Sequence, residues 1–209
     1  MAENFTAGDN EKEHVVKVQS EITRSGSIDN IPYEANIPVK SQHQWIGILR
    51  ITFGLVWAVA AWLKWQPGFI SSFEDTIKQA TTGQPPLVQS WIGLWVSLVH
   101  INPILFASIV AIIETALAIC FIFGIFTNAA AVVGAIYSII IWSIAEGFGG
   151  PYVLGQNTDI GTAFPYMIVC LLLLLVSSGD YLGLDRTLTP KLGNLSFLAT
   201  GRKQHSTRI

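Results

Sequence analysis

The run ILFASIVAIIETALAICFIFGIFTNAAAVVGAIYSIIIWSIAE, residues 104–146, decides the fold of this chain. It holds two apolar stretches, 104–126 and 129–146, which are separated only by Thr127-Asn128. A helix of about 20 apolar residues crosses the ~30 Å hydrocarbon core of a bilayer. The two stretches are therefore predicted to form a hairpin of two membrane-spanning helices.

Two further stretches, residues 45–65 and 162–178, also have the length and composition of membrane spans. We therefore expect an all-α integral membrane protein built as a four-helix bundle. Shorter helices are predicted at about 70–80 and 86–99. The second of these carries two tryptophans four residues apart, which is typical of a helix that lies in the membrane interface.

The overall composition excludes several classes of protein. Charged residues make up 12% of the 209 residues and hydrophobic residues 51%, and the mean hydropathy is +0.48. So little charge cannot cover the surface of a soluble globular domain, and a disordered chain would show the opposite pattern. The net charge of −2 offers no basic excess for binding nucleic acid. The composition indicates a membrane protein.

The basic residues divide the chain into three parts and predict its orientation. Residues 1–44 form a polar tail that we expect to be partly disordered, 45–186 form the membrane domain, and 187–209 form a basic tail. Lys and Arg are concentrated in the two tails. Because loops rich in Lys and Arg stay in the cytoplasm, both termini are predicted to be cytoplasmic and the long connections to face outward.

Ionisable side chains inside or at the ends of the spans are candidates for function, since charges are costly in a membrane. They are Arg50, Lys64, Glu114 and Glu146. Arg50 and Lys64 share one helical face of the first span, where each either contributes to a site or reaches the headgroups from a helix end. Glu114 lies in the middle of the second span. It either pairs with Arg50 and ties two helices together, or it accepts protons in quinone chemistry.

A glycine-rich loop, GFGGPYVLGQNTDIG at residues 147–161, follows Glu146 directly. It has no basic residue and matches no phosphate-binding pattern. We expect an outer pocket where this loop meets the end of the first span. Its predicted members are Lys64, Trp65, Glu146, Tyr152 and Asp159, with Tyr166 one or two turns below. For the acidic members, the alternative role is a helix cap or a solvated loop charge.

The cysteines and histidines suggest no metal or haem chemistry. Cys120 and Cys170 lie within apolar runs, where cysteine packs as a small hydrophobic residue. Only His100 among the four histidines is near a span, whereas a membrane haem needs axial ligands inside the spans. We therefore predict no haem and no metal in this chain.

Several motifs together resemble the DoxD branch of the DoxD/DoxX membrane proteins over about residues 45–186. In chain order they are RITFGLVWAVAAWLKWQPGF (50–69), IETALAICFIFGIFTNAAAVVG (113–134), WSIAEGFGGPY (142–152), TDIGTAFPY (158–166) and SSGDYLGLDR (177–186). The Lys64-Trp65 pair and the GFGGPY sequence after Glu146 are among the distinctive parts. The polar N-terminal tail lies outside the resemblance.

The resemblance implies a membrane subunit of thiosulfate:quinone oxidoreductase. Such an enzyme oxidises thiosulfate to tetrathionate at the outer face of a prokaryotic, archaeal cell membrane and passes the electrons to membrane quinone. DoxD is described as working with a smaller subunit, DoxA. The expected partners are therefore a DoxA-like subunit or other respiratory subunits, membrane lipid and further copies of this chain, but no nucleic acid.

Each candidate residue has a role under this interpretation. Lys64 attracts the thiosulfate dianion, Glu146 or Glu114 accepts protons, and Asp159 is a further catalytic candidate. The quinone-binding candidates are Trp65, Trp142, Arg50, Tyr152 and Tyr166. The alternative is a non-catalytic membrane subunit that anchors or assembles a larger respiratory complex. A transporter of small solutes or lipids is the third hypothesis.

Overall fold

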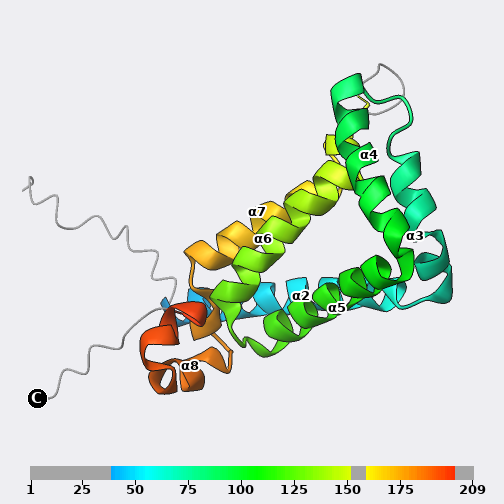
Figure 1. Cartoon of the computed structure of the whole chain (residues 1–209). Helices are drawn as coiled ribbons and strands as arrows, with labels where there is room; N and C mark the ends of the chain where they lie inside the picture. The colour runs from blue at the N-terminus through cyan, green and yellow to red at the C-terminus, as the bar shows by residue number, and fades with distance from the viewer. Residues whose placement is uncertain (1–38, 152–158, 201–209) are drawn as a thin grey trace, which may run out of the picture. The chain divides into compact units, whose positions relative to one another are not determined.

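The computed structural model describes residues 39–151 and 159–200, and every regular element in these ranges is a helix. The longer helices are α2 (Val39–Lys64), α3 (Pro67–Gln79), α4 (Pro86–Ile101), α5 (Pro103–Phe123), α6 (Thr127–Ile144) and α7 (Ala163–Leu175), and the short α8 (Asp185–Leu188) follows (Figure 1). Short 3-10 helices form η2 (Gly147–Gly149), η3 (Ser178–Asp180), η4 (Thr189–Lys191) and η5 (Gly193–Leu198). Most of the predicted polar tail, residues 1–38, lies outside the described residues.

Three of the described helices are long and apolar enough to cross a membrane. They are Gln44–Lys64 within α2, Pro103–Phe123 and Thr127–Ile144. Their positions match three of the four predicted spans. Many large apolar side chains on these helices are exposed, which is the pattern of surfaces that face lipid rather than water. The prediction of an all-helical membrane protein is confirmed to this extent.

The fourth predicted span, residues 162–178, contains a shorter helix than expected. α7 has 13 residues, so it is about 20 Å long at a rise of ~1.5 Å per residue, less than the ~30 Å hydrocarbon core. The helix stops because the chain turns at Ser177, whose φ of 49° lies in the left-handed region. Apolar composition alone did not reveal this turn.

The hairpin predicted for residues 104–146 is present and is sharply defined at both ends of α5. At its start, the side chain of Asn102 accepts a hydrogen bond from the amide of Leu105 at 3.0 Å, and Pro103 occupies the first turn. At its end, Gly124 has a φ of 64° and its amide donates back to the Cys120 carbonyl. α5 therefore ends three residues earlier than predicted, and α6 begins two residues earlier.

One apolar core joins α2, α5, α6 and α7. α6 and α7 lie side by side, and α2 runs beside α5 (Figure 1). The ring of Phe53 on α2 packs against Phe121 on α5 with centroids 5.3 Å apart, and Trp57 meets Tyr137 on α6 and Tyr166 on α7. These ring contacts hold the four helices around the region where the candidate site lies.

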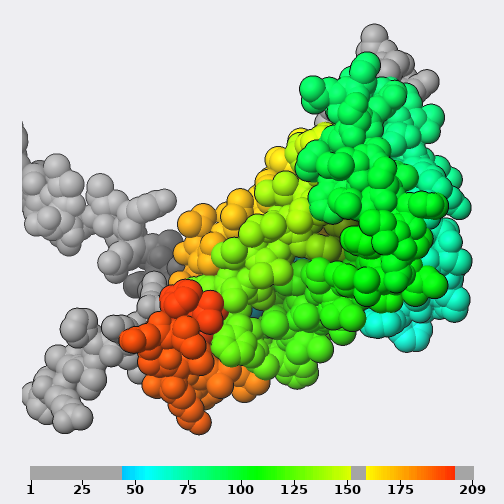
Figure 2. Space-filling view, viewed as in Figure 1, coloured from blue at the N-terminus to red at the C-terminus, as the bar shows by residue number. Residues whose placement is uncertain are grey.

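A second core joins α3 and α4 to the ends of α5 and α6. Its buried members are Phe73, Ile77, Ile92, Val99, Ala107 and Ile144. Both helices were predicted, with bounds that differ by at most three residues. α4 lies at the surface (Figure 2). It keeps Leu87, Leu94 and Ile101 exposed, so its outer face is apolar as well. An apolar outer face agrees with the predicted location at the membrane interface.

Candidate functional site

The Arg50 side chain is fully buried and is held entirely by backbone carbonyl groups. Its Nε donates to the Phe121 carbonyl at 2.9 Å, and its Nη1 donates to the carbonyls of Ser178 at 2.8 Å and Tyr181 at 3.0 Å. Its Nη2 donates to the Leu182 carbonyl at 2.9 Å. The alternative in which Arg50 pairs with Glu114 is therefore wrong, because carbonyls on α5 and in the segment after α7 use the guanidinium instead.

Asp185 completes this cluster by fixing the start of α6. Its carboxylate accepts hydrogen bonds from the amides of Phe126 at 2.7 Å and Thr127 at 2.8 Å, and from the Thr127 hydroxyl at 2.5 Å. A carboxylate at a helix N-terminus stabilises the helix by satisfying free amides. We call Arg50, Asp185, Thr127 and their backbone partners the polar clamp.

Two glycines of the SSGDYLGLDR motif are required for the clamp to close. A methyl group on Gly183 would lie 2.7 Å from Arg50 Nη1 and 2.6 Å from the Gly179 carbonyl oxygen. A methyl group on Gly179 would lie 2.5 Å from Asp185 Oδ2. The motif therefore has a structural explanation: it lets the chain approach the two buried charges.

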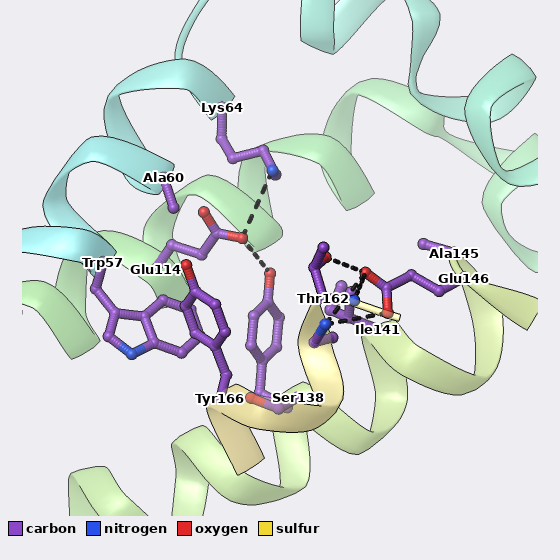
Figure 3. Close-up of a pocket in the computed structure, with 12 residues that line it drawn as sticks. Trp57, Ala60, Lys64, Glu114, Ser138, Ile141, Ala145, Glu146, Thr162 and Tyr166 are labelled. Atoms are coloured by element: carbon purple, nitrogen blue, oxygen red, sulfur yellow. Dashed lines mark hydrogen bonds and ion pairs between the residues drawn. The ribbon is translucent and has the colours of Figure 1, made fainter. Parts of the chain in front are cut away.

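A pocket of about 300 Å³ lies among α2, α5, α6 and the start of α7 (Figure 3). It is lined by Trp57, Ala60, Lys64, Glu114, Tyr137, Ser138, Ile141, Ala145, Glu146, Thr162, Ala163 and Tyr166. The structure thus brings together four of the predicted site residues, namely Lys64, Glu114, Glu146 and Tyr166. Its volume is at the lower end of the range for small-molecule sites.

Glu114 is the buried acid of this pocket, with only 4% of its surface exposed. Its Oε1 accepts a hydrogen bond from the Tyr137 hydroxyl at 2.9 Å, and the Lys64 ammonium lies 3.9 Å from the same oxygen. The Lys64 side chain is 28% exposed, so its charge is partly solvated. Figure 3 shows Lys64 and Glu114 facing each other across the pocket.

Three buried polar atoms of the pocket have no hydrogen-bond partner among the described residues. They are Trp57 Nε1, Ser138 Oγ and Glu114 Oε2. Buried polar atoms are normally satisfied by protein, water or a ligand, because an unmade hydrogen bond is costly. The indole can donate a hydrogen bond, the hydroxyl can donate or accept, and the carboxyl can accept or, when protonated, donate. The pocket can therefore bind a small molecule that has more than one polar atom.

Glu146 lies in the same pocket but is used as a helix cap. Its carboxylate accepts hydrogen bonds from the amides of Thr162 at 3.1 Å and Ala163 at 3.0 Å, and from the Thr162 hydroxyl. Figure 3 shows its side chain turned toward Thr162. The alternative role of a cap thus fits Glu146, although the helix it caps is α7 rather than its own. Both oxygens of the group are engaged.

The other predicted site residues do not line the pocket. The Trp65 indole donates to the Thr115 hydroxyl at 3.0 Å, and the Trp142 indole donates to the Ile160 carbonyl at 2.7 Å. Asp159 is exposed, and Tyr152 lies outside the described residues. In residues 39–151 and 159–200 there is no group of three or more His, Cys, Asp or Glu side chains placed to hold a metal ion.

Sequence reasoning missed Tyr137, which is the hydrogen-bond donor to Glu114. A signal for it was present. A buried acid needs a donor from a neighbouring helix, and Tyr137 and Ser138 form an adjacent polar pair within the third span.

The comparisons with known proteins give one match. Residues 46–147 match the model of the DoxX family, which is just under half of the chain. No curated protein and no solved structure matches the chain. The matched segment includes Lys64, Glu114, Tyr137 and Glu146, but it leaves out α7 and the SSGDYLGLDR motif. The chain is thus similar to DoxX membrane proteins in the helices that carry most of the pocket.

Proposed function

We propose that this DoxX-like chain is the membrane subunit of a quinone-linked oxidoreductase, and that the pocket around Glu114 binds the quinone headgroup. The observation that carries the proposal is the buried Glu114 carboxyl, whose Oε2 has no hydrogen-bond partner among the described residues, in a pocket between apolar helices that Trp57 and Ser138 also line. A quinone headgroup is a flat apolar ring with two carbonyl oxygens. It enters from the lipid phase, which the exposed apolar surfaces of the helices would contact.

The residues present fit such a headgroup. The Ser138 hydroxyl is a donor for one of its carbonyl oxygens, and the rings of Trp57 and Tyr166, with centroids 5.2 Å apart, offer an aromatic wall. A quinone takes up two electrons and two protons on reduction. Glu114 is placed to hold a proton at Oε2, and the Tyr137 hydroxyl keeps the carboxyl oriented.

Lys64 is the residue we assign to the anionic substrate. It lies at the end of α2, its side chain is partly exposed, and its ammonium is over the ring of Phe69 at 4.9 Å. In the proposed reaction, two thiosulfate ions lose one electron each and join through a new S–S bond to give tetrathionate. The two electrons reduce one quinone, which also takes two protons. A DoxA-like subunit or other respiratory subunits would act with this chain.

The test is thiosulfate-dependent reduction of a short-chain quinone analogue by the purified protein, with its co-purifying partners. Lys64→Ala is expected to raise the KM for thiosulfate, and Glu114→Gln to lower kcat by about 100-fold, the usual contribution of one acid–base group. Lys78→Ala is the matched control, since Lys78 is also an exposed lysine but does not line the pocket.

Three outcomes decide between the functions. Activity at the wild-type level in both pocket variants would remove the site assignment. Binding of the quinone analogue without any turnover, with or without partners, would retain the pocket but favour the non-catalytic anchoring subunit. If the analogue fails to quench the Trp57 fluorescence, measured against a Trp57→Phe variant, the quinone site itself is wrong.

We further propose that α7 and η3 form the fourth crossing segment, in a cell membrane with both termini in the cytoplasm. α7 packs along α6 for most of its length (Figure 1) and exposes Leu171, Leu172 and Leu175. In a chain with Cys120 and Cys170 replaced by alanine, we expect Ser27→Cys and Ser206→Cys to be labelled from one side only. Thr82→Cys should be labelled from the other side. Labelling of the two tails from opposite sides would exclude a fourth crossing.

A further inference from the structure

A second pocket, separate from the one around Glu114, lies where α5 ends and the segment after η3 begins. Its volume is about 450 Å³, and it is lined by Ile122, Phe123, Leu182, Gly183, Leu184 and Arg186. Three of these side chains are large, apolar and at least 48% exposed, namely Phe123, Leu182 and Leu184. An apolar wall of this kind at the surface of a membrane protein is suited to a hydrocarbon chain.

Arg186 is the charged member of this pocket. It is exposed, and no hydrogen bond or ion pair joins its guanidinium to another side chain among the described residues. It stands in contrast to Arg50, whose three guanidinium nitrogens all donate to carbonyls. An arginine beside an apolar groove can bind a phosphate through two parallel hydrogen bonds.

The position of the pocket along the helices matches the depth of lipid headgroups. Phe123 is the last residue of α5, which is one of the three candidate spans, and it lines the same pocket as Arg186 of α8. The pocket therefore lies at the end of a span, where hydrocarbon gives way to the polar interface. Arg186 and Lys191 also start the run of basic residues that continues into the C-terminal tail, and such segments attract anionic lipids.

We infer that this pocket binds an anionic phospholipid, with the phosphate at Arg186 and an acyl chain along Phe123, Leu182 and Leu184. Gly183, which lines the pocket, is also a residue that lets the chain approach Arg50, so the lipid lies next to the polar clamp.

The experiment is native mass spectrometry of the full chain in detergent with phosphatidylglycerol or phosphatidylcholine of the same acyl chains. We expect the wild type to retain one phosphatidylglycerol in preference to phosphatidylcholine. Arg186→Gln should weaken that preference about five-fold, the effect expected for one basic residue at an anionic membrane surface. Arg186→Lys should keep most of it, and soluble glycerol phosphate should not displace the lipid.

Two matched variants distinguish specific binding in the pocket from general attraction of anionic lipid to the basic residues of this segment. Lys191→Gln removes an exposed basic residue of the same segment that does not line the pocket, so it should leave the preference unchanged. Leu184→Ser should reduce the retention of both lipids by removing acyl contact. The inference is overturned if Arg186→Gln binds as the wild type does, or if Lys191→Gln and Arg186→Gln lose the preference equally. Because both arginine variants keep an exposed polar side chain, folding is checked simply by helical circular dichroism.

Discussion

The polar clamp and the Glu114 pocket are two buried polar clusters in the same bundle, and they are satisfied to very different degrees. In the clamp, Arg50 makes four hydrogen bonds to carbonyls and Asp185 accepts three from the start of α6. In the pocket, Glu114 has one hydrogen bond and one distant ammonium, and three polar atoms lack partners. Both contain charges that the helices would have to bury in a membrane.

The difference separates structural charges from functional ones. An ionisable group inside a span is unfavourable unless it is paired. In the clamp, partners from the chain itself form hydrogen bonds with both charged groups. In the pocket, some buried polar atoms lack a hydrogen-bond partner, which is expected where a ligand binds. A charged residue within a membrane span is therefore a weaker sign of function than a charged residue whose partners are missing.

The clamp should be the more sensitive of the two clusters to mutation. Arg50→Met keeps the length of the side chain but leaves four carbonyls without their donor. We expect the free energy of unfolding to fall by on the order of 4 kcal/mol, since each buried group left without a partner costs ~1–3 kcal/mol. Unfolding in detergent measures the loss, and Lys191→Met on an exposed lysine is the control. A change of less than ~1 kcal/mol would mean that Arg50 does not form these hydrogen bonds.

The glycines test the clamp through packing rather than charge. Gly183→Ala places a methyl group 2.7 Å from Arg50 Nη1, so either the guanidinium or the backbone must move. We expect a loss of about 2 kcal/mol, within the range for overpacking a well-packed site. Gly93→Ala is the matched control, because nothing lies within 4 Å of a methyl group there. It lies inside α4, where alanine is the better helix former, so this variant should be neutral or slightly stabilising.

Residue patterns predicted the hairpin of α5 and α6, because long apolar runs are local; they did not predict the end of α5 at Gly124. They also placed Lys64 and Glu146 in one outer pocket with Tyr166 just below, whereas Glu114 was predicted separately, in the middle of the second span. These predictions succeeded where helical periodicity and the order of the spans decide which residues meet.

The remaining features depend on contacts between distant segments that no local pattern specifies. One alternative paired Arg50 with the Glu114 carboxylate, but the partners of Arg50 are carbonyls, and any residue type can supply a carbonyl. Glu146 was expected to act from the end of its own helix, but it caps α7, which begins 17 residues later. The early end of α7 depends on a left-handed turn at Ser177, a residue type with no strong preference for that conformation.

The pocket should tolerate substitution better than the clamp while losing its ligand. Glu114→Gln keeps an acceptor for the Tyr137 hydroxyl and removes the charge. We therefore expect the free energy of unfolding to change by less than ~1 kcal/mol. The same variant should bind the quinone analogue about five-fold more weakly, because it loses the hydrogen bond that the protonated Glu114 carboxyl donates to a quinone carbonyl oxygen. Unfolding and analogue titration on one preparation give both values. A loss of stability as large as that of Arg50→Met would make Glu114 a structural residue and erase the contrast.

The exposed cluster on α3 and α4 gives the smallest expected effect and a reference for both buried clusters. Glu74 accepts a charged hydrogen bond from Lys78 at 2.7 Å and contacts His100 at 2.9 Å. The hydrogen bonds from Lys78 and then His100 lower the pKa of the Glu74 carboxyl from its ordinary value of 4.5. A lowered pKa in the folded state means that the interaction stabilises the fold above pH 4.5 and is lost as the pH falls below it.

This pH dependence can be isolated with two conservative variants. Glu74→Gln should lower the unfolding temperature slightly at pH 7 and not at pH 3, because solvent screens an exposed ion pair and protonation removes it. Asp75→Asn is the matched control, since Asp75 is more exposed and lies 3.8 Å from the same lysine; its effect should be smaller still. If Glu74→Gln matched Arg50→Met at pH 7, exposure to solvent would not explain the ranking of the clusters. The ranking would then have to be tested again with variants that shift a charged group along its helix, so that the effect of hydrogen bonding can be measured separately from the effect of burial.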